Sequence, residues 1–162
     1  MTEIQQIEGH TQEVASLLIP MNGNHLLIPN VTVAEIVPVS QVTPVLRSPD
    51  WYLGNCRWRE QTVPLLAYEV LNGDEKPFVN ARSRFAVLNT TGKDDSLPFI
   101  AVLTQGLPRL ARVTEEEIVR RDDVENKSFE LMHISWAGED AVIPNIPKME
   151  SFFLNYLLTN KR

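Results

Sequence analysis

The sequence predicts a mainly β protein built as a small barrel or sandwich. Roughly eight to ten short apolar runs are separated by Gly, Pro, Asn and Asp turn signals, a spacing typical of all-β folds. With 162 residues, 43% of them hydrophobic, the chain has the size and composition of one globular domain with its own core. We expect residues 1–11 to be a flexible N-terminus and residues 12–160 to form a single domain.

The net charge and the cysteine count narrow the classes of function. A net charge of −6 argues against nucleic-acid binding and against docking on anionic lipid, because both favour a basic surface. Cys56 is the single cysteine, so we expect neither an intrachain disulfide nor a thiolate metal cluster. The sequence has no secretory signal pattern and no apolar run long enough to span a bilayer. We therefore expect a cytoplasmic protein without direct membrane insertion, metal or cofactor.

The first part of the chain is predicted to contain a hairpin followed by an ambiguous segment. Strands are expected at Glu13–Met21 and His25–Ile28, on either side of the turn signal Asn22-Gly23-Asn24. The run Val31–Val37 follows a Pro-Asn pair that can cap a short helix, but its β-branched residues make a strand the alternative. Val39–Leu46 is then predicted to be a strand.

Leu53–Glu69 is predicted to form a second hairpin with two different faces, because strand side chains alternate. The outward residues are Asn55, Arg57 and Arg59, and the inward residues are Cys56 and Trp58. A turn is expected around Arg59–Gln61, and the apolar return strand Thr62–Tyr68 is typical of a strand covered on both faces. Arg on a rigid strand is a good recognition group, because its guanidinium can bind a carboxylate with two hydrogen bonds.

The second half of the chain continues the alternation of strands and turns. A surface loop is predicted over Leu71–Arg84, and a solvated loop over Arg120–Lys127. Thr114 and Glu117 have the spacing of a capping box, which marks the start of a helix. Further strands are predicted at Arg84–Thr90, Pro98–Leu103, Arg109–Val113, Phe129–Trp136 and Ala141–Ile143.

A C-terminal helix is predicted from Pro147 to about Thr159. Five apolar residues fall on one face at helical spacing: Met149, Phe152, Phe153, Tyr156 and Leu157. We expect this face to pack on the protein's own core, and a partner-binding helix is the alternative.

Catalytic candidates are few. Cys56 is interpreted as a small buried hydrophobe and His133, in the middle of a predicted strand, as a hydrogen-bonded structural histidine. The sequence has no nucleophile elbow, no zinc-protease motif and no phosphate-binding glycine loop. A non-enzymatic protein is therefore expected. The alternative is a small β-barrel hydrolase or ligand-binding protein that uses Cys56 or His133.

The hairpin also carries a pattern of spaced residues. Gly54 precedes Arg59 by five positions, and the apolar-Pro-apolar run Val63-Pro64-Leu65-Leu66 follows. This pattern resembles the chemotaxis coupling-protein (CheW-like) family, which has a Gly, four residues, an Arg-Gly turn and an apolar-Pro-apolar strand. The hairpin departs from this pattern at two places. Glu60 stands where the family usually has Gly, and Ala67-Tyr68 stands where the family usually has Asp-Leu.

The resemblance covers roughly Glu13 to Leu158 and implies two intertwined SH3-like barrels. It implies an adaptor that couples the cytoplasmic tip of a chemoreceptor to the regulatory domain of a CheA-like histidine kinase, in chemotaxis or twitching motility. The departures suggest a divergent member, of the kind found beside a main coupling protein in pilus-type chemosensory systems. A competitive scaffold that binds one partner only is the other arrangement compatible with the sequence.

The resemblance also implies that Glu35 pairs with Arg59 at the groove that faces the partners. The competing interpretation is an ordinary exposed ion pair, which contributes about 0–1 kcal/mol to stability. Glu60 is expected to make the turn wider or differently shaped, because Glu tolerates a positive φ poorly, and to place a negative charge beside Arg59. The residues predicted to form the partner-binding surface are Val33, Glu35, Gly54, Arg57, Arg59 and Glu60.

Overall fold

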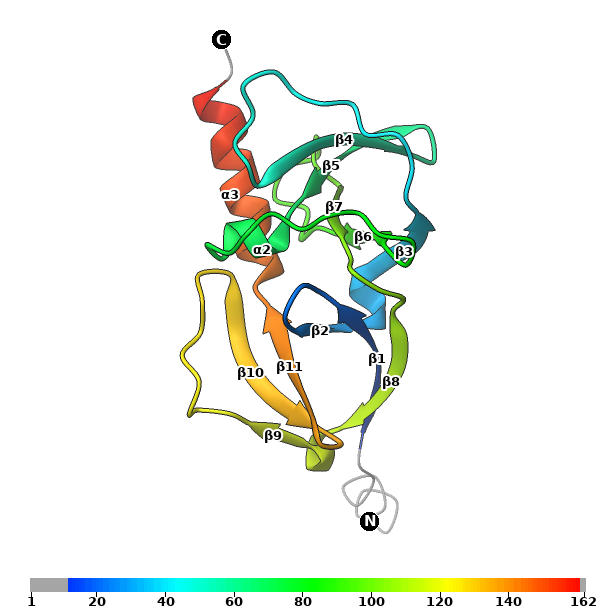
Figure 1. The fold of residues 1–162 in the computed structure, drawn as a ribbon, viewed down its shortest axis with the longest axis vertical. Helices are drawn as coiled ribbons and strands as arrows, with labels where there is room; N and C mark the ends of the chain where they lie inside the picture. The colour runs from blue at the N-terminus through cyan, green and yellow to red at the C-terminus, as the bar shows by residue number, and fades with distance from the viewer. Residues whose placement is uncertain (1–11, 161–162) are drawn as a thin grey trace, which may run out of the picture.

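The computed structural model describes residues 12–160, so the predicted flexible N-terminus lies outside the described residues. Two small β-barrels lie end to end, and one C-terminal helix runs along the side of one of them (Figure 1). The prediction of a mainly β protein with two barrel subdomains, short helices and a C-terminal helix is confirmed.

The first barrel is a six-stranded sheet with the strand order β8-β1-β2-β11-β10-β9. Its strands are β1 (Glu13–Pro20), β2 (His25–Pro29), β8 (Arg109–Thr114), β9 (Ile118–Arg120), β10 (Glu130–Trp136) and β11 (Glu139–Pro144). Strands from the first and last parts of the chain meet in this sheet, because β2 pairs in parallel with β11 at Leu26 and Val142. All other pairings in the sheet are antiparallel.

The second barrel is a five-stranded sheet with the strand order β3-β6-β7-β5-β4. Its strands are β3 (Val33–Pro38), β4 (Tyr52–Trp58), β5 (Gln61–Leu66), β6 (Arg84–Asn89) and β7 (Phe99–Leu103). These strands lie between β2 and β8 in sequence, so the second barrel is an insertion within the first.

Four helical elements complete the fold. Two are 3₁₀ turns, η1 (Asn30–Thr32) and η2 (Glu115–Glu117), and two are α-helices, α2 (Tyr68–Leu71) and α3 (Ile146–Thr159). The predicted capping box is present at the start of η2, where Glu117 Oε1 lies 3.1 Å from the Thr114 backbone nitrogen and 2.8 Å from its hydroxyl. The capping signal therefore marks one turn of 3₁₀ helix before β9.

The structure corrects three local predictions. The short helix at Val31–Val37 is wrong, because only the first residues form the turn η1 and the rest is β3, paired with β6. Val39–Leu46 is not a strand, and it meets β4 through a single bridge between Thr43 and Asn55. The return strand of the second hairpin ends at Leu66, so Tyr68 belongs to α2.

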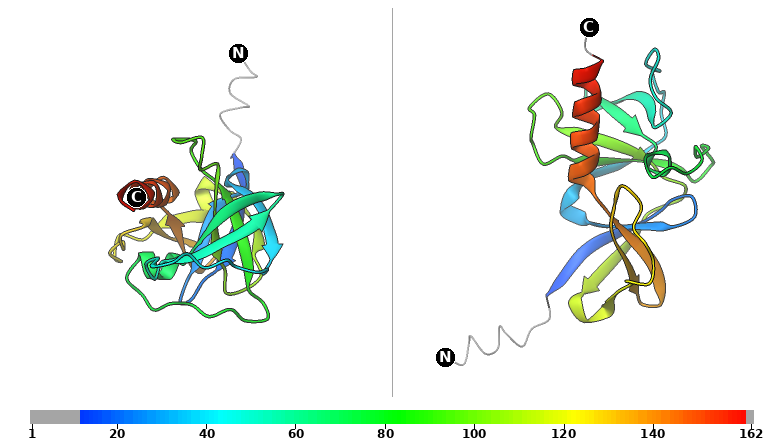
Figure 2. Two further views of the ribbon diagram at one scale, coloured as in Figure 1. Left: turned by 90° about the horizontal axis from the view of Figure 1, so that it is seen from above. Right: turned by 90° about the vertical axis from the view of Figure 1, so that its left-hand side faces the viewer.

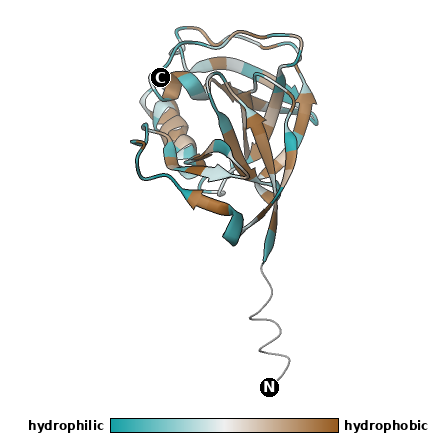
Figure 3. Cartoon of the chain, turned by 60° about the horizontal axis from the view of Figure 1, so that its bottom comes forward, coloured by the Kyte–Doolittle hydropathy of each residue, from teal (hydrophilic) through white to brown (hydrophobic). Residues whose placement is uncertain are grey.

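Apolar residues line the strands, and the connecting loops are mostly hydrophilic (Figure 3). Each barrel has its own small core. The core of the five-stranded barrel consists of Cys56, Trp58, Val63, Leu65, Phe85, Val87, Ala101 and Leu103. The core of the six-stranded barrel consists of Leu18, Leu27, Ala111, Val113, Ile134 and Ala141. Successive residues of β1 and β2 face opposite ways, so Ile19 and Leu26 instead join a third, larger core with residues from the other barrel and α3.

Helix α3 packs against this third core. Figure 2 shows the helix running beside the five-stranded barrel. Met149 and Phe153 are buried, and the ring of Phe153 lies 5.0 Å from the ring of Tyr52 in an edge-to-face arrangement. The expectation that the apolar face covers the protein's own core is therefore confirmed for its central residues. Phe152 and Leu157, at the edges of that face, stay partly exposed.

A buried carboxylate fastens α3 to the five-stranded barrel. Glu150 accepts hydrogen bonds from the backbone nitrogen of Thr91 at 2.7 Å and from that of Lys93 at 3.1 Å, in the loop between β6 and β7. Burial alone would raise the pKa of Glu150, but the hydrogen bonds from Thr91 and Lys93 outweigh it and lower that pKa below its usual value.

Glu150→Gln is expected to destabilise the fold at pH 7 by about 1–3 kcal/mol, because the amide is a weaker acceptor for these buried donors. A carboxyl group with a lowered folded-state pKa stabilises above its unfolded-state pKa and loses that effect as pH falls through the folded-state value. Urea unfolding across a pH series should therefore show the gap to the wild type closing in acid. Glu75→Gln, at an exposed loop residue, is the control, and a gap that does not depend on pH would contradict the assignment.

Candidate functional site

The candidate site is built on the tight turn between β4 and β5. Trp58 pairs with Gln61, so the turn consists of Arg59 and Glu60 alone. Their φ angles are 48° and 64°, as in a type I′ turn, whose twist matches that of the flanking strands. The predicted widening by Glu60 is wrong, because both residues adopt the left-handed conformation instead.

Three side chains converge beside this turn. The carboxylate oxygen Oε1 of Glu35 lies 3.2 Å from Nη2 of Arg59 and accepts a 2.8 Å hydrogen bond from the indole Nε1 of Trp58. The guanidinium carbon of Arg59 lies 4.7 Å from the centre of the Trp58 ring. The predicted pairing of Glu35 with Arg59 is therefore present, and the indole joins it.

This cluster connects the two edges of the five-stranded sheet. Glu35 belongs to β3 and Trp58 to β4, which are the first and last strands in the sheet order. The Trp58 side chain is 7% exposed and packs edge-on against Phe99 at 4.7 Å between ring centres. The side chains of Arg59 and Glu35 are 66% and 43% exposed. A rigid buried ring thus carries two accessible charged groups of opposite sign.

The other predicted site residues lie around the cluster in different settings. Arg57 is exposed on the outward face of β4, 3.4 Å from the hydroxyl of Thr62 on β5. Val33 is half-buried against the large core. Glu60 is exposed, and among residues 12–160 the carboxylate within ion-pair distance of Arg59 is that of Glu35 and not that of Glu60. Partner binding by these residues stays a prediction.

Gly54 is buried and supports the site through its backbone. Its φ is +132°, and a Cβ there would lie 2.5 Å from the carbonyl oxygen of Thr43 and 2.7 Å from Cγ1 of Val42. The segment containing Thr43 crosses β4 at this point and exchanges two 2.8 Å backbone hydrogen bonds with Asn55. Only Gly allows so close an approach at a positive φ.

Cys56 has the surroundings of a packing residue. It is 2% exposed, and its thiol lies 3.6 Å from the carbonyl oxygen of Val63 on the neighbouring strand. Burial raises the pKa of the Cys56 thiol, so the reactive thiolate is disfavoured. This setting argues against a nucleophilic role.

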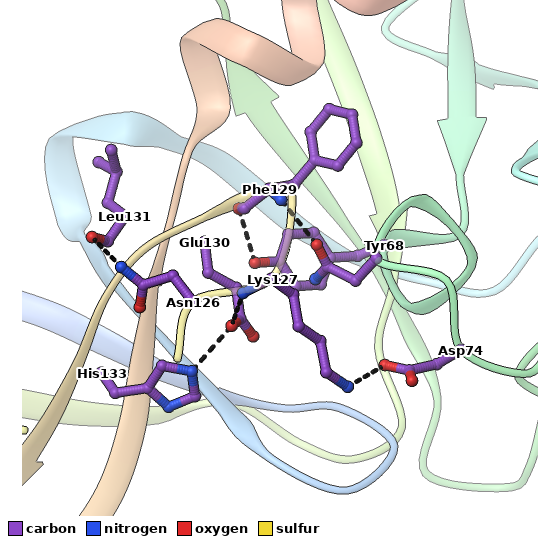
Figure 4. Close-up of polar contacts among 9 residues, drawn as sticks. Tyr68, Asp74, Asn126, Lys127, Phe129, Glu130, Leu131 and His133 are labelled. Carbon is purple, nitrogen blue, oxygen red and sulfur yellow. Dashed lines mark hydrogen bonds and ion pairs between the residues drawn. The ribbon is translucent and has the colours of Figure 1, made fainter. Parts of the chain in front are cut away.

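His133 belongs to a polar network that connects the two barrels (Figure 4). Its Nε2 lies 2.8 Å from Oε1 of the buried Glu130, and the same oxygen accepts a 2.7 Å hydrogen bond from the Lys127 backbone. Nearby, the hydroxyl of Tyr68 in α2 donates to the carbonyl oxygen of Phe129 at 2.9 Å. His133 is therefore hydrogen-bonded as expected for a structural histidine.

Trp58 is the site residue that the sequence did not single out. Its inward position on the hairpin indicated a buried anchor, and the structure confirms the burial. The available signal was its position between Arg57 and Arg59 together with its N–H, because a buried indole usually finds a hydrogen-bond acceptor.

Residues 12–160 contain neither a metal-binding cluster nor a membrane-crossing helix. No group of three or more His, Cys, Asp or Glu side chains in that range is arranged to hold a metal ion. No helix in the same range is long and apolar enough to cross a membrane.

Comparison with known proteins assigns the fold to a family. Residues 15–151 match the CheW-like domain. The chain belongs to the CheW-like family.

Among solved structures, the chain is similar to the scaffolding protein TtCheW from Thermoanaerobacter tengcongensis. The TM-score is 0.70 with 14% sequence identity, over 84% of this chain and 86% of the other. At that identity the likeness concerns the fold. No curated protein matches the chain. The CheW-like family is a family of non-catalytic scaffolds, which is consistent with the buried Cys56 and the hydrogen-bonded His133.

The close approach of Gly54 to the segment containing Thr43 leads to a prediction about the stability of this CheW-like fold. Gly54→Ala is expected to lower the free energy of unfolding by at least about 2 kcal/mol, because the methyl group meets backbone and the φ is unfavourable. Gly73→Ala is the matched control, since Gly73 also has a positive φ but has open space around it. Urea unfolding of both variants measures the difference, and equal losses would refute the steric argument.

The departure from the usual Gly at position 60 leads to a second prediction. Glu60→Gly is expected to raise the free energy of unfolding by about 0.5–1 kcal/mol, because Gly adopts the left-handed conformation without steric penalty. Glu60→Ala removes the same charge but keeps the unfavourable conformation, so it should stay near the wild type. Thermal and urea unfolding compare the three proteins, and equal stability of the two variants would point to charge instead of conformation.

Proposed function

We propose that this CheW-like protein is a non-enzymatic adaptor that couples the cytoplasmic tip of a chemoreceptor to the regulatory domain of a CheA-like histidine kinase. Family membership supports the coupling role, because the family consists of scaffolds. The observation that carries the proposal for this chain is the exposed Glu35–Arg59 pair at a stiff hairpin turn.

The pair is better suited to recognition than to stability. An exposed ion pair contributes only about 0–1 kcal/mol to folding, yet the chain holds Arg59 in an unfavourable backbone conformation to place it there. The rest of the hairpin is rigid, because the β5 residues from Val63 to Leu66 are all buried. Binding through a rigid element loses little conformational entropy, so these charges can fix the register of a partner.

An exposed apolar residue four positions before Glu35 in the sequence is a second feature of this part of the chain. Val31, in η1 just before β3, is 86% exposed, and its carbonyl oxygen accepts a 3.1 Å hydrogen bond from the Asn89 side chain. This contact ties the backbone of η1, which leads into β3 and Glu35, to the end of β6. An apolar contact with a rim of charged groups is the usual composition of a protein interface.

The sharpest test of this surface is Arg59→Glu. The substitution is expected to reduce retention of the chemoreceptor and the kinase at least about tenfold in a pull-down from cell lysate, because it reverses the charge that meets the partner. Circular dichroism should stay that of the wild type.

Arg120→Glu is the matched control, because Arg120 is an exposed arginine on β9 of the other barrel that also pairs with a carboxylate, that of Asp122. It should retain both partners at the level of the wild type. Equal losses from both variants, or loss of the fold in Arg59→Glu, would count against a recognition surface at Arg59.

A further inference from the structure

Trp58 contacts both charged residues of the site with different parts of its side chain. Its indole N–H donates to Oε1 of Glu35 at 2.8 Å, and its ring lies 4.7 Å from the guanidinium carbon of Arg59. The same oxygen, Oε1, lies 3.2 Å from Nη2 of Arg59. Among residues 12–160, the indole therefore contacts both members of the ion pair, Glu35 through its N–H and Arg59 through its ring.

The Trp58 ring is a fixed reference point for these groups. It is 7% exposed and belongs to the core of the five-stranded barrel, with Phe99 packed edge-on against it. Side chains in such cores occupy defined rotamers. The direction of the indole N–H is therefore set by the core, and it does not depend on the solvent-exposed groups that it meets.

An isolated exposed Glu–Arg pair loses side-chain entropy when it forms, which is why such pairs are weak. Here the Glu35 carboxylate accepts a hydrogen bond from the rigid indole of Trp58. A hydrogen bond to a charged acceptor is stronger than one between neutral groups. Arg59 is then held on one side by that carboxylate and on the other by the face of the ring. Both charged groups are placed before any partner arrives.

We propose that Trp58 is a positioning residue of the partner-binding surface: its indole N–H orients the Glu35 carboxylate and its ring holds Arg59, so that the pair is preorganised for recognition. The binding part of this inference rests on the proposed function. The orienting part does not, because it concerns contacts within the free protein. Preorganisation increases affinity by removing the entropy lost on binding.

The orienting part is tested by nuclear magnetic resonance on the free, ¹⁵N-labelled protein. The chain has three tryptophans, Trp51, Trp58 and Trp136, and the indole N–H signal that Trp58→Phe removes is that of Trp58. Glu35→Ala should move this signal and leave the signals of the other two in place. An unmoved Trp58 signal would overturn the inference whatever the protein binds.

The binding part is tested by a double-mutant cycle with the purified receptor tip and kinase regulatory domain. Trp58→Phe keeps an aromatic ring but removes the N–H donor, and it should weaken binding about three- to tenfold, the range for one lost hydrogen bond. The effect of Arg59→Ala should be smaller in the Trp58→Phe background than in the wild type, because an arginine that is no longer oriented contributes less. Trp51→Phe, at a half-buried tryptophan beside α3, is the matched control and should leave binding unchanged.

The outcomes separate the two proposals. Purely additive effects of Trp58→Phe and Arg59→Ala on affinity would mean that Trp58 contributes stability only, and the positioning role would be overturned. If Arg59→Glu and Trp58→Phe both leave binding unchanged while Glu35→Ala moves the Trp58 signal, the proposed recognition surface fails and the orienting contact stands. Unfolding free energies of all variants show whether any loss of binding is a loss of fold.

Discussion

The surface of the five-stranded barrel depends on one carboxylate oxygen that accepts a hydrogen bond from an indole and forms an ion pair with a guanidinium. Oε1 of Glu35 lies within bonding distance of the Trp58 indole and of the Arg59 guanidinium, so it links the edge strand β3 to the opposite edge strand β4. The indole belongs to the core and the guanidinium to the surface. The side chain of Glu35 therefore couples the packing inside the barrel to the placement of charge on its surface.

The backbone near this carboxylate adopts conformations that most residues avoid. Arg59 and Glu60 both have positive φ without being glycine, and Gly54 combines a positive φ with direct contact to the crossing segment at Thr43. Such conformations persist only where the surroundings enforce them. Here the enforcement comes from the buried strand β5 and from the bridge between Thr43 and Asn55. Glu60 thus adopts a left-handed conformation within a two-residue turn, at the position where the CheW-like pattern usually has Gly.

Buried acidic residues connect segments that are distant in sequence. Glu150 binds the loop at Thr91, and Glu69 of α2 accepts a 2.9 Å hydrogen bond from the Asn22 backbone in the β1–β2 turn. The two environments shift the pKa in opposite directions. Burial raises the pKa of Glu69, and one of its carboxylate oxygens has no hydrogen-bond partner among residues 12–160. Hydrogen bonds lower the pKa of Glu150 despite its burial. With the shared apolar core, these contacts make the two barrels and α3 one packed unit.

The sequence by itself determined the features that depend on local periodicity and capping. Apolar runs between turn signals predicted most of the strands, and alternation on the second hairpin predicted the burial of Cys56 and Trp58. The capping box and the helical stripe marked η2 and α3. Only the tertiary structure decided the conformation of Val31–Val37, because its β-branched run fits a helix or a strand until β6 offers a partner. It also decided that the Trp58 N–H meets Glu35, 23 positions away. Which distant groups meet is set by how the barrel closes, and a local pattern contains no information about that closure.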